Sequence, residues 1–142
     1  MLERMRIMWE KILSSIGVGS VKVDTLVKEA KLRKGSTLKG EVLITAGRTE
    51  QRIESIVLTL FVRYEAEKED TDFSYHEKEM AEIIINHDES IEKGVEKRIP
   101  FEIQLEKDHP VTSETVETFL RTTLIIPQAI DQKDEDSIIV TS

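Results

Sequence analysis

The sequence predicts an all-β domain: an antiparallel β-sandwich of about seven strands, preceded by one short amphipathic helix. Three observations support this fold class. Apolar residues recur with the period of a helix before residue 17, and with a period of two over most of the chain after residue 19. Turn residues separate the alternating runs. No segment between these runs has the length of the helical crossover that parallel pairing usually needs.

The helix is expected over residues 2–16. Its apolar stripe consists of Leu2, Met5, Trp9, Ile12, Leu13 and Ile16. Gly17 and Gly19 predict its end, because glycine adopts the left-handed conformation that terminates helices at no steric cost. The chain therefore divides into an N-terminal helix and turn, residues 1–19, and one sandwich domain, residues 20–142.

Seven alternating segments predict the strands of the sandwich. They cover residues 21–27, 37–45, 56–64, 73–86, 99–105, 116–126 and 138–141. Residues 56–64 are apolar on both faces, which predicts a central strand. Pro100 predicts an edge or a bulge, because proline has no N–H for the ladder. The charged residues 65–72 predict an exposed hairpin loop, and residues 87–94 predict a turn.

Composition excludes several classes of function. The 142 residues carry a net charge of -8, and we interpret the basic residues as dispersed, with no cluster on one face, so we expect no nucleic-acid partner. Cysteine is absent, which rules out disulfides and thiolate sites and fits a cytoplasmic protein. The apolar runs are too short to span a bilayer, so we expect no integral membrane association.

No chemistry-bearing motif is evident, so we expect no catalytic residue, no metal and no cofactor. His76, His87 and His109 lack the spacing of metal ligands, and we interpret them as surface or turn histidines. An alternative function is a calcium-dependent ligand-binding module that uses acidic loops. Its candidate ligands are Asp70, Asp72, Asp88, Glu89, Asp131, Asp134 and Asp136.

Two surfaces are candidates for binding protein partners. The first is the helix stripe, nominated at Met5, Trp9, Ile12 and Leu13. This stripe packs on the sandwich itself, on a partner or on a second copy of the chain, and the sequence leaves these alternatives open.

The second candidate surface is a strand edge after the first strand, where Lys28, Lys31, Arg33 and Lys34 follow one another closely. We nominate Lys31 and Arg33. Their charges either guard the edge against unwanted pairing or attract an acidic segment of a partner, which would add to the sheet as an extra strand.

Three stretches carry a family resemblance. Residues 15–27 read SIGVGSVKVDTLV, residues 52–68 read RIESIVLTLFVRYEAEK, and residues 121–140 read RTTLIIPQAIDQKDEDSIIV. Together they resemble the bacterial sporulation-control protein family. The resemblance implies an arrestin-like sandwich, a non-enzymatic regulatory or scaffold role, and no cofactor. Members of this family usually carry a second sandwich domain, so the chain is expected to correspond to the first.

Overall fold

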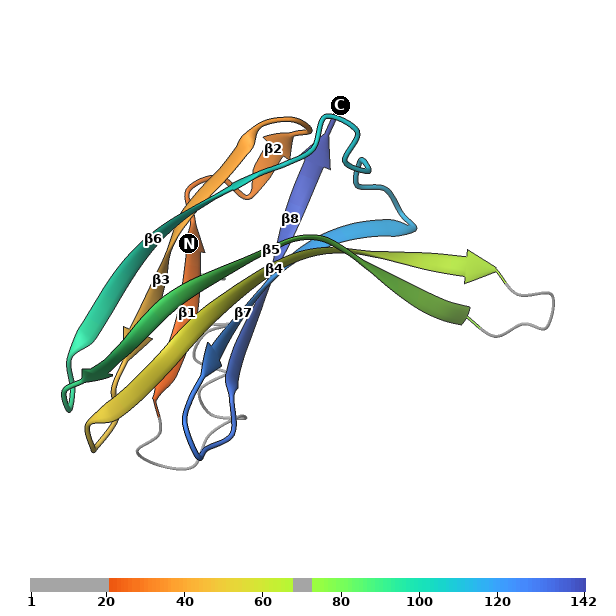
Figure 1. Cartoon of the computed structure of the whole chain (residues 1–142). Coiled ribbons are helices and arrows are strands. Elements are labelled where there is room, and N and C mark those ends of the chain that lie inside the picture. Colours follow the sequence, from red (N-terminus) through yellow and green to blue (C-terminus); the bar gives the residue numbers. More distant parts are fainter. Residues whose placement is uncertain (1–20, 68–72) are drawn as a thin grey trace.

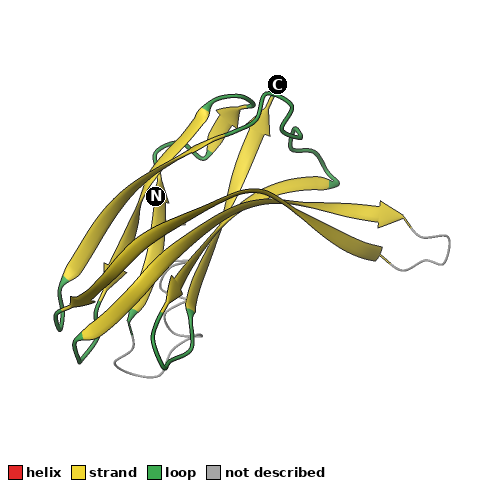
Figure 2. Cartoon of the chain, viewed as in Figure 1, coloured by secondary structure: helices red, strands yellow, loops and turns green. Residues whose placement is uncertain are grey.

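The computed structural model describes residues 21–67 and 73–142, and within these ranges every regular element is a strand (Figure 2). The eight strands are β1 (Lys22–Val27), β2 (Lys31–Arg33), β3 (Thr37–Thr45), β4 (Gln51–Glu67), β5 (Phe73–Ile91), β6 (Glu96–Gln104), β7 (Val116–Ile125) and β8 (Gln132–Thr141). The helix expected over residues 2–16 lies outside the described residues. The described ranges contain no helix of the length and apolarity needed to cross a membrane.

The strands form two sheets that face each other (Figure 1). One has three strands in the order β1-β3-β6, and the other has five in the order β2-β8-β7-β4-β5. All neighbours are antiparallel except β2 and β8, which are parallel. The expectation of about seven strands in purely antiparallel sheets was therefore wrong at β2. This strand has only three residues, too few to show an alternating pattern.

Alternate residues of both sheets point between the layers and form one hydrophobic core. Its fully buried members include Leu38, Val42, Ile44, Ile56, Leu58, Leu60, Leu120 and Leu124. They come from β3, β4 and β7, the central strands of the two sheets. Burial of each such side chain contributes about 1.5–3 kcal/mol to stability. These strands therefore hold the edge strands in place.

β4 lies between β7 and β5, as its two apolar faces predict. On its outer face, Phe61 is only 2% exposed. The Phe61 ring stacks on that of Phe119 with 5.5 Å between centroids, and the guanidinium of Arg121 lies 4.4 Å from the Phe61 centroid. Glu135 holds Arg121 through an ion pair of 2.7 Å. Side chains of the same sheet thus shield this face from water.

β4, β5 and β8 are each at least five residues longer than the sequence pattern predicted. β4 continues through Glu67 and β5 through Ile91, so the loop expected at 65–72 and the turn expected at 87–94 are partly strand. β8 begins at Gln132 and includes the acidic residues expected in a turn. Backbone pairing decides these boundaries, because exposed positions of a paired strand tolerate charge. The β4–β5 hairpin projects beyond the rest of the sandwich (Figure 1).

β6 is an edge strand of the three-stranded sheet, which confirms the prediction from Pro100. The bond from the Leu105 N–H to the Ser36 carbonyl oxygen, 2.9 Å, shows that the odd-numbered residues of β6 form the backbone hydrogen bonds to β3. The backbone groups of the even-numbered residues, including the Pro100 nitrogen, therefore point away from β3. The proline therefore removes no ladder bond and leaves a gap in the donors of the outer edge.

Candidate partner-binding site

Two of the six nominated residues lie in the described part of the chain. Lys31 and Arg33 are the first and last residues of β2, and both side chains are exposed. Among the described strands β2 pairs with β8 alone, and it is the end strand of the five-stranded sheet. The remaining nominated residues, Met5, Trp9, Ile12 and Leu13, lie outside the described residues, and binding through the helix stripe stays a prediction.

The expectation of dispersed basic residues was wrong, because they concentrate around β2. Residues 21–40 carry six basic and two acidic residues, a net charge of +4, and are termed the basic segment. The rest of the chain carries fourteen basic and twenty-six acidic residues, a net charge of -12. β1 and β3 are neighbours in one sheet and β2 lies at the edge of the other, so the basic segment follows one side of the sandwich. This protein, which is acidic as a whole, therefore has one region of net positive charge.

Lys28 and Lys39 lie opposite each other where β1 leaves its sheet. The register of β1 and β3 pairs Val27 with Gly40, and the next rung is the bond from the Lys28 N–H to the Lys39 carbonyl oxygen, 2.8 Å. Both side chains are exposed. Like charges directly opposite in an antiparallel pair destabilise it. This pair, termed the lysine pair, therefore costs the sheet some stability.

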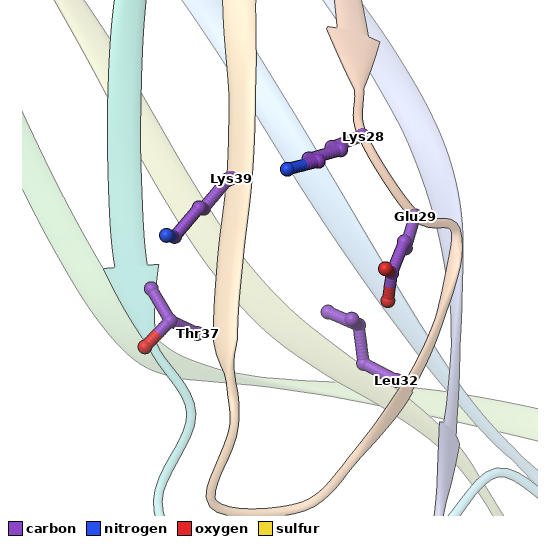
Figure 3. A pocket seen from close by; sticks show the side chains of 5 residues that line it. All are labelled: Lys28, Glu29, Leu32, Thr37 and Lys39. Atoms are coloured by element: carbon purple, nitrogen blue, oxygen red, sulfur yellow. The ribbon is translucent and has the colours of Figure 1, made fainter.

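Two clefts share the lysine pair. The first has a volume of about 170 Å³ and is lined by Lys28, Glu29, Leu32, Thr37 and Lys39. The second has a volume of about 290 Å³ and is lined by Leu26, Val27, Lys28, Lys39, Gly40 and Glu41. In Figure 3 the Lys28 side chain extends from the end of β1 toward β3, and Leu32 lies below it. The Lys39 side chain extends from β3 away from Lys28 in this view, toward β6. Each cleft is thus lined by both lysines, by apolar residues and by one glutamate.

A buried polar seam joins β1 to the opposite sheet. The Thr25 N–H donates to Oδ2 of Asp134 at 3.0 Å, and the hydroxyls of Thr25 and Thr122 are 2.6 Å apart. All three residues are at most 2% exposed. The Thr25 N–H points away from β3, so the carboxylate of Asp134 occupies the place where a neighbouring strand would pair. The seam thus holds β1 between β3 and the β7–β8 pair.

Three of the acidic residues proposed as calcium ligands take separate structural roles. Asp88 pairs with Arg52, Asp131 Oδ1 accepts the Ile126 N–H at 3.3 Å, and Asp134 belongs to the seam. Asp70 and Asp72 lie outside the described residues. Among the residues that are described, no three histidine, cysteine or carboxylate side chains gather in a group suited to a metal ion.

The three histidines, predicted to be surface or turn residues, occupy different environments. His109 lies at a turn, closed by the bond from its N–H to the Glu106 carbonyl oxygen at 3.1 Å, but its side chain is not at the surface. His76 is exposed and stacks on Tyr64, with 5.4 Å between centroids, and His87 is half-buried. His109 is 1% exposed, and its Nε2 lies 3.0 Å from Oγ1 of Thr118. Burial lowers the pKa of His109 below 6.5, although the charge of Asp108 acts in the opposite direction.

The lysine pair and the polar seam were missed in the sequence because both depend on pairing between distant segments. In the sequence, Lys39 is only one polar position in an alternating strand. Its pairing with Lys28 could not be predicted, because the chain forms β2 in the other sheet between the two residues. Thr25 and Asp134 are 109 residues apart. The short basic run that contains Lys31 and Arg33 was the one sequence signal for this side of the sandwich.

Comparisons with known proteins agree with this architecture. A family model described as SpoOM protein matches residues 9–142. The sporulation-control protein Spo0M of Bacillus subtilis (strain 168) is 32% identical over 132 residues, which cover 93% of this chain and 51% of that protein. The crystal structure of Spo0M from Bacillus subtilis matches with a TM-score of 0.80 at 30% identity, over 88% of this chain and 51% of that one.

The similarity of fold confirms the arrestin-like sandwich implied by the resemblance. The chain spans about half the length of the relatives it matches. The family model covers far more than half of the chain. The chain therefore belongs to the SpoOM family of sporulation-control proteins.

Proposed function

We propose that this domain is a non-enzymatic regulatory module that binds an acidic segment of a protein partner along its basic segment. The observation that carries the proposal is the separation of charge, +4 in residues 21–40 against -12 in the rest. The basic segment attracts an acidic partner to one side of the molecule, and the negative charge of the rest of the chain repels that partner elsewhere. The absence of cysteine fits action in the cytoplasm.

The outer edge of β2 offers a backbone template for such a segment. The bonds from the Ile139 N–H to the Ala30 oxygen, 2.7 Å, and from the Lys34 N–H to the Thr141 oxygen, 2.9 Å, connect β2 to β8 through even-numbered residues. By alternation, the backbone groups of Lys31 point away from β8. An extended partner segment that pairs there would place acidic side chains near Lys31 and Arg33.

These charges serve attraction better than protection alone. An edge is guarded by charge of either sign, and acidic residues are the commoner kind in this chain. Lys31, Arg33 and Lys34 lie on or next to β2, whereas Lys22, Lys28 and Lys39 lie on or next to β1 and β3. The basic charge therefore extends beyond the edge that would need a guard. A surface of one sign also rejects partners of the same sign, which gives the domain selectivity for acidic segments.

A double charge reversal tests the proposal. Lys31→Glu with Arg33→Glu is expected to weaken binding of a fluorescein-labelled Glu–Ser repeat peptide by roughly tenfold or more, in fluorescence anisotropy at low salt. Binding to the unsubstituted chain should weaken as NaCl rises, because salt screens exposed charges. The matched control is Lys93→Glu with Lys97→Glu, at exposed positions near β6. Equal losses in both double variants would show that net charge, not this side, governs binding.

The helix stripe is a second proposed contact surface, supported by the apolar spacing of Met5, Trp9 and Ile12. Replacement of Trp9 and Ile12 by Asp is expected to convert a dimer into a monomer if the stripe joins two copies. Light scattering of the full chain measures this change, and circular dichroism shows whether the fold persists. An unchanged mass with an intact fold would remove self-association through the helix.

A further inference from the structure

The lysine pair is an unfavourable arrangement that the fold does not require. Lys22 lies on the same face of β1, but its cross-strand partner is the neutral Thr45. At the other end of the strand, Lys28 faces a second cation, Lys39. Departures from local rules of this kind concentrate at functional sites, where a ligand compensates for the cost.

The described residues compensate this repulsion only in part. Lys39 Nζ lies 3.8 Å from a carboxylate oxygen of Glu102, and the two side chains are 53% and 68% exposed. Water screens such a pair, so it contributes little. Within the described ranges, Lys28 has no carboxylate oxygen within 4.0 Å of its ammonium group. Both lysine side chains are exposed, so an anion that both of them contact would be attracted by both and would offset their repulsion.

The two clefts define what accompanies this anion. On one side of the lysine pair the surface includes Leu32, and on the other it includes Leu26 and Val27. Glu29 and Glu41, one in each cleft, repel further negative charge. A long polyanion such as a nucleic acid fits this pattern poorly. A single carboxylate with an apolar side chain on each side fits it well.

We propose that the lysine pair and its two clefts form a recognition site for an extended protein segment with one central Glu or Asp. Alternate side chains of an extended segment point to the same face. The central carboxylate therefore lies between Lys28 and Lys39 when apolar residues two positions before and after it occupy the clefts. The proposal rests on the proposed function, because it specifies the acidic segment that the basic segment binds.

A set of three peptides in one frame tests this specificity. The first carries Leu-Ser-Glu-Ser-Leu at its centre, the second replaces both leucines by serine, and the third replaces the central Glu by Gln. Binding to the full chain is measured by fluorescence anisotropy. We expect the first peptide to bind roughly tenfold more tightly than either of the others, the loss typical of one charge-assisted hydrogen bond or one buried apolar group.

Substitutions in the protein locate the effect. Lys28→Gln and Lys39→Gln are expected to remove the preference for Glu over Gln, whereas Lys22→Gln, on the same face of β1, should retain it. All three side chains are exposed, so the fold is expected to persist, and the melting temperature checks this. Retention of the full preference in Lys28→Gln and Lys39→Gln would overturn the inference.

The outcomes separate this inference from the proposed function. Loss of peptide binding on charge reversal at Lys31 and Arg33, with no effect of Lys28→Gln or Lys39→Gln, would keep the proposed function and overturn the inference. Binding of phosphatidylserine vesicles in place of all three peptides would overturn both. A preference for Glu that depends on Lys28 and Lys39 but not on the flanking leucines would overturn the role of the clefts.

Discussion

The two long sides of the sandwich solve the problem of exposed strand edges in different ways. On the side of β1 and β2 the segment is basic, and a buried carboxylate pairs with the outward N–H of Thr25. On the side of β5 and β6, residues 73–104 carry four basic and eight acidic residues. There the edge strand β6 is interrupted by Pro100. The edge strand β5 is interrupted by two irregularities, one opposite Ile53–Ser55 of its partner β4 and one opposite Leu60–Phe61.

The difference shows which side is suited to receive a strand. Bulges and prolines disrupt the regular row of donors that an added strand would need. Asp88, which has a positive φ of 42° within β5, marks one of these irregularities. β2 has no bulge or proline, but it is short, and its outward Arg33 carbonyl oxygen already accepts the Ser36 N–H at 3.1 Å. The outward backbone groups of Lys31 therefore form the template on this strand. The β1–β2 side thus retains a template for a partner, whereas the β5–β6 side is protected.

The largest expected difference between the two sides is the loss of stability when a glycine is replaced by alanine. A Cβ on Gly40 would lie 2.8 Å from Cζ of Phe101 and would also collide with the backbone oxygen of Leu26. Gly40→Ala should therefore cost about 3 kcal/mol of unfolding free energy, in urea denaturation. Gly94→Ala on the β5–β6 side meets nothing within 4 Å but has a φ of +72°, and should cost about 1 kcal/mol. Equal costs would contradict tight packing at Gly40.

The polar seam should give the next effect. Asp134→Ala leaves the buried N–H of Thr25 without its acceptor, which is expected to cost about 2–3 kcal/mol. Asp131→Ala removes an acceptor from the half-buried Ile126 N–H, at a longer distance of 3.3 Å, and should cost less than about 1 kcal/mol. Urea denaturation compares the two variants. Similar costs would mean that the seam does not hold β1 in place.

His109, in the connection from β6 to β7, should make stability depend on pH. Burial lowers its pKa in the folded state, so the unfolded chain binds the proton more readily. The contribution of His109 is fully present above the unfolded pKa of 6.5 and is lost as pH falls below it toward the folded pKa. Urea midpoints at pH 7.5 and 5.5 measure this loss. His109→Gln should reduce it, and His76→Gln, at an exposed position, should not.

The smallest expected effect is a gain in stability. Lys28→Gln removes the repulsion from Lys39 and should stabilise the domain by about 0.2–1 kcal/mol in low salt. The gain should shrink at high salt, because exposed charges are screened. Lys22→Gln, opposite Thr45, should show no gain. A destabilised Lys28→Gln variant would show that the lysine pair is not strained.

Much of the fold was evident from local pattern. The strands at 37–45 and 116–125, the central position of β4 and the edge position of β6 all follow from alternation and from Pro100. The lengths of β5 and β8 did not, because their charged residues are stabilised by backbone pairing that no local window records. β2 was not predicted, because its parallel partner strand lies more than 100 residues away.

For the site, the sequence alone determined composition and local order: an acidic, cysteine-free chain with a basic run at Lys31 and Arg33. Only the tertiary structure decided which of these groups meet. The register of β1 and β3 places Lys28 opposite Lys39, and the packing of the two sheets places Asp134 on the backbone of Thr25. The physical reason is that alternation specifies which face a side chain occupies, whereas register and the packing of the sheets specify its neighbours.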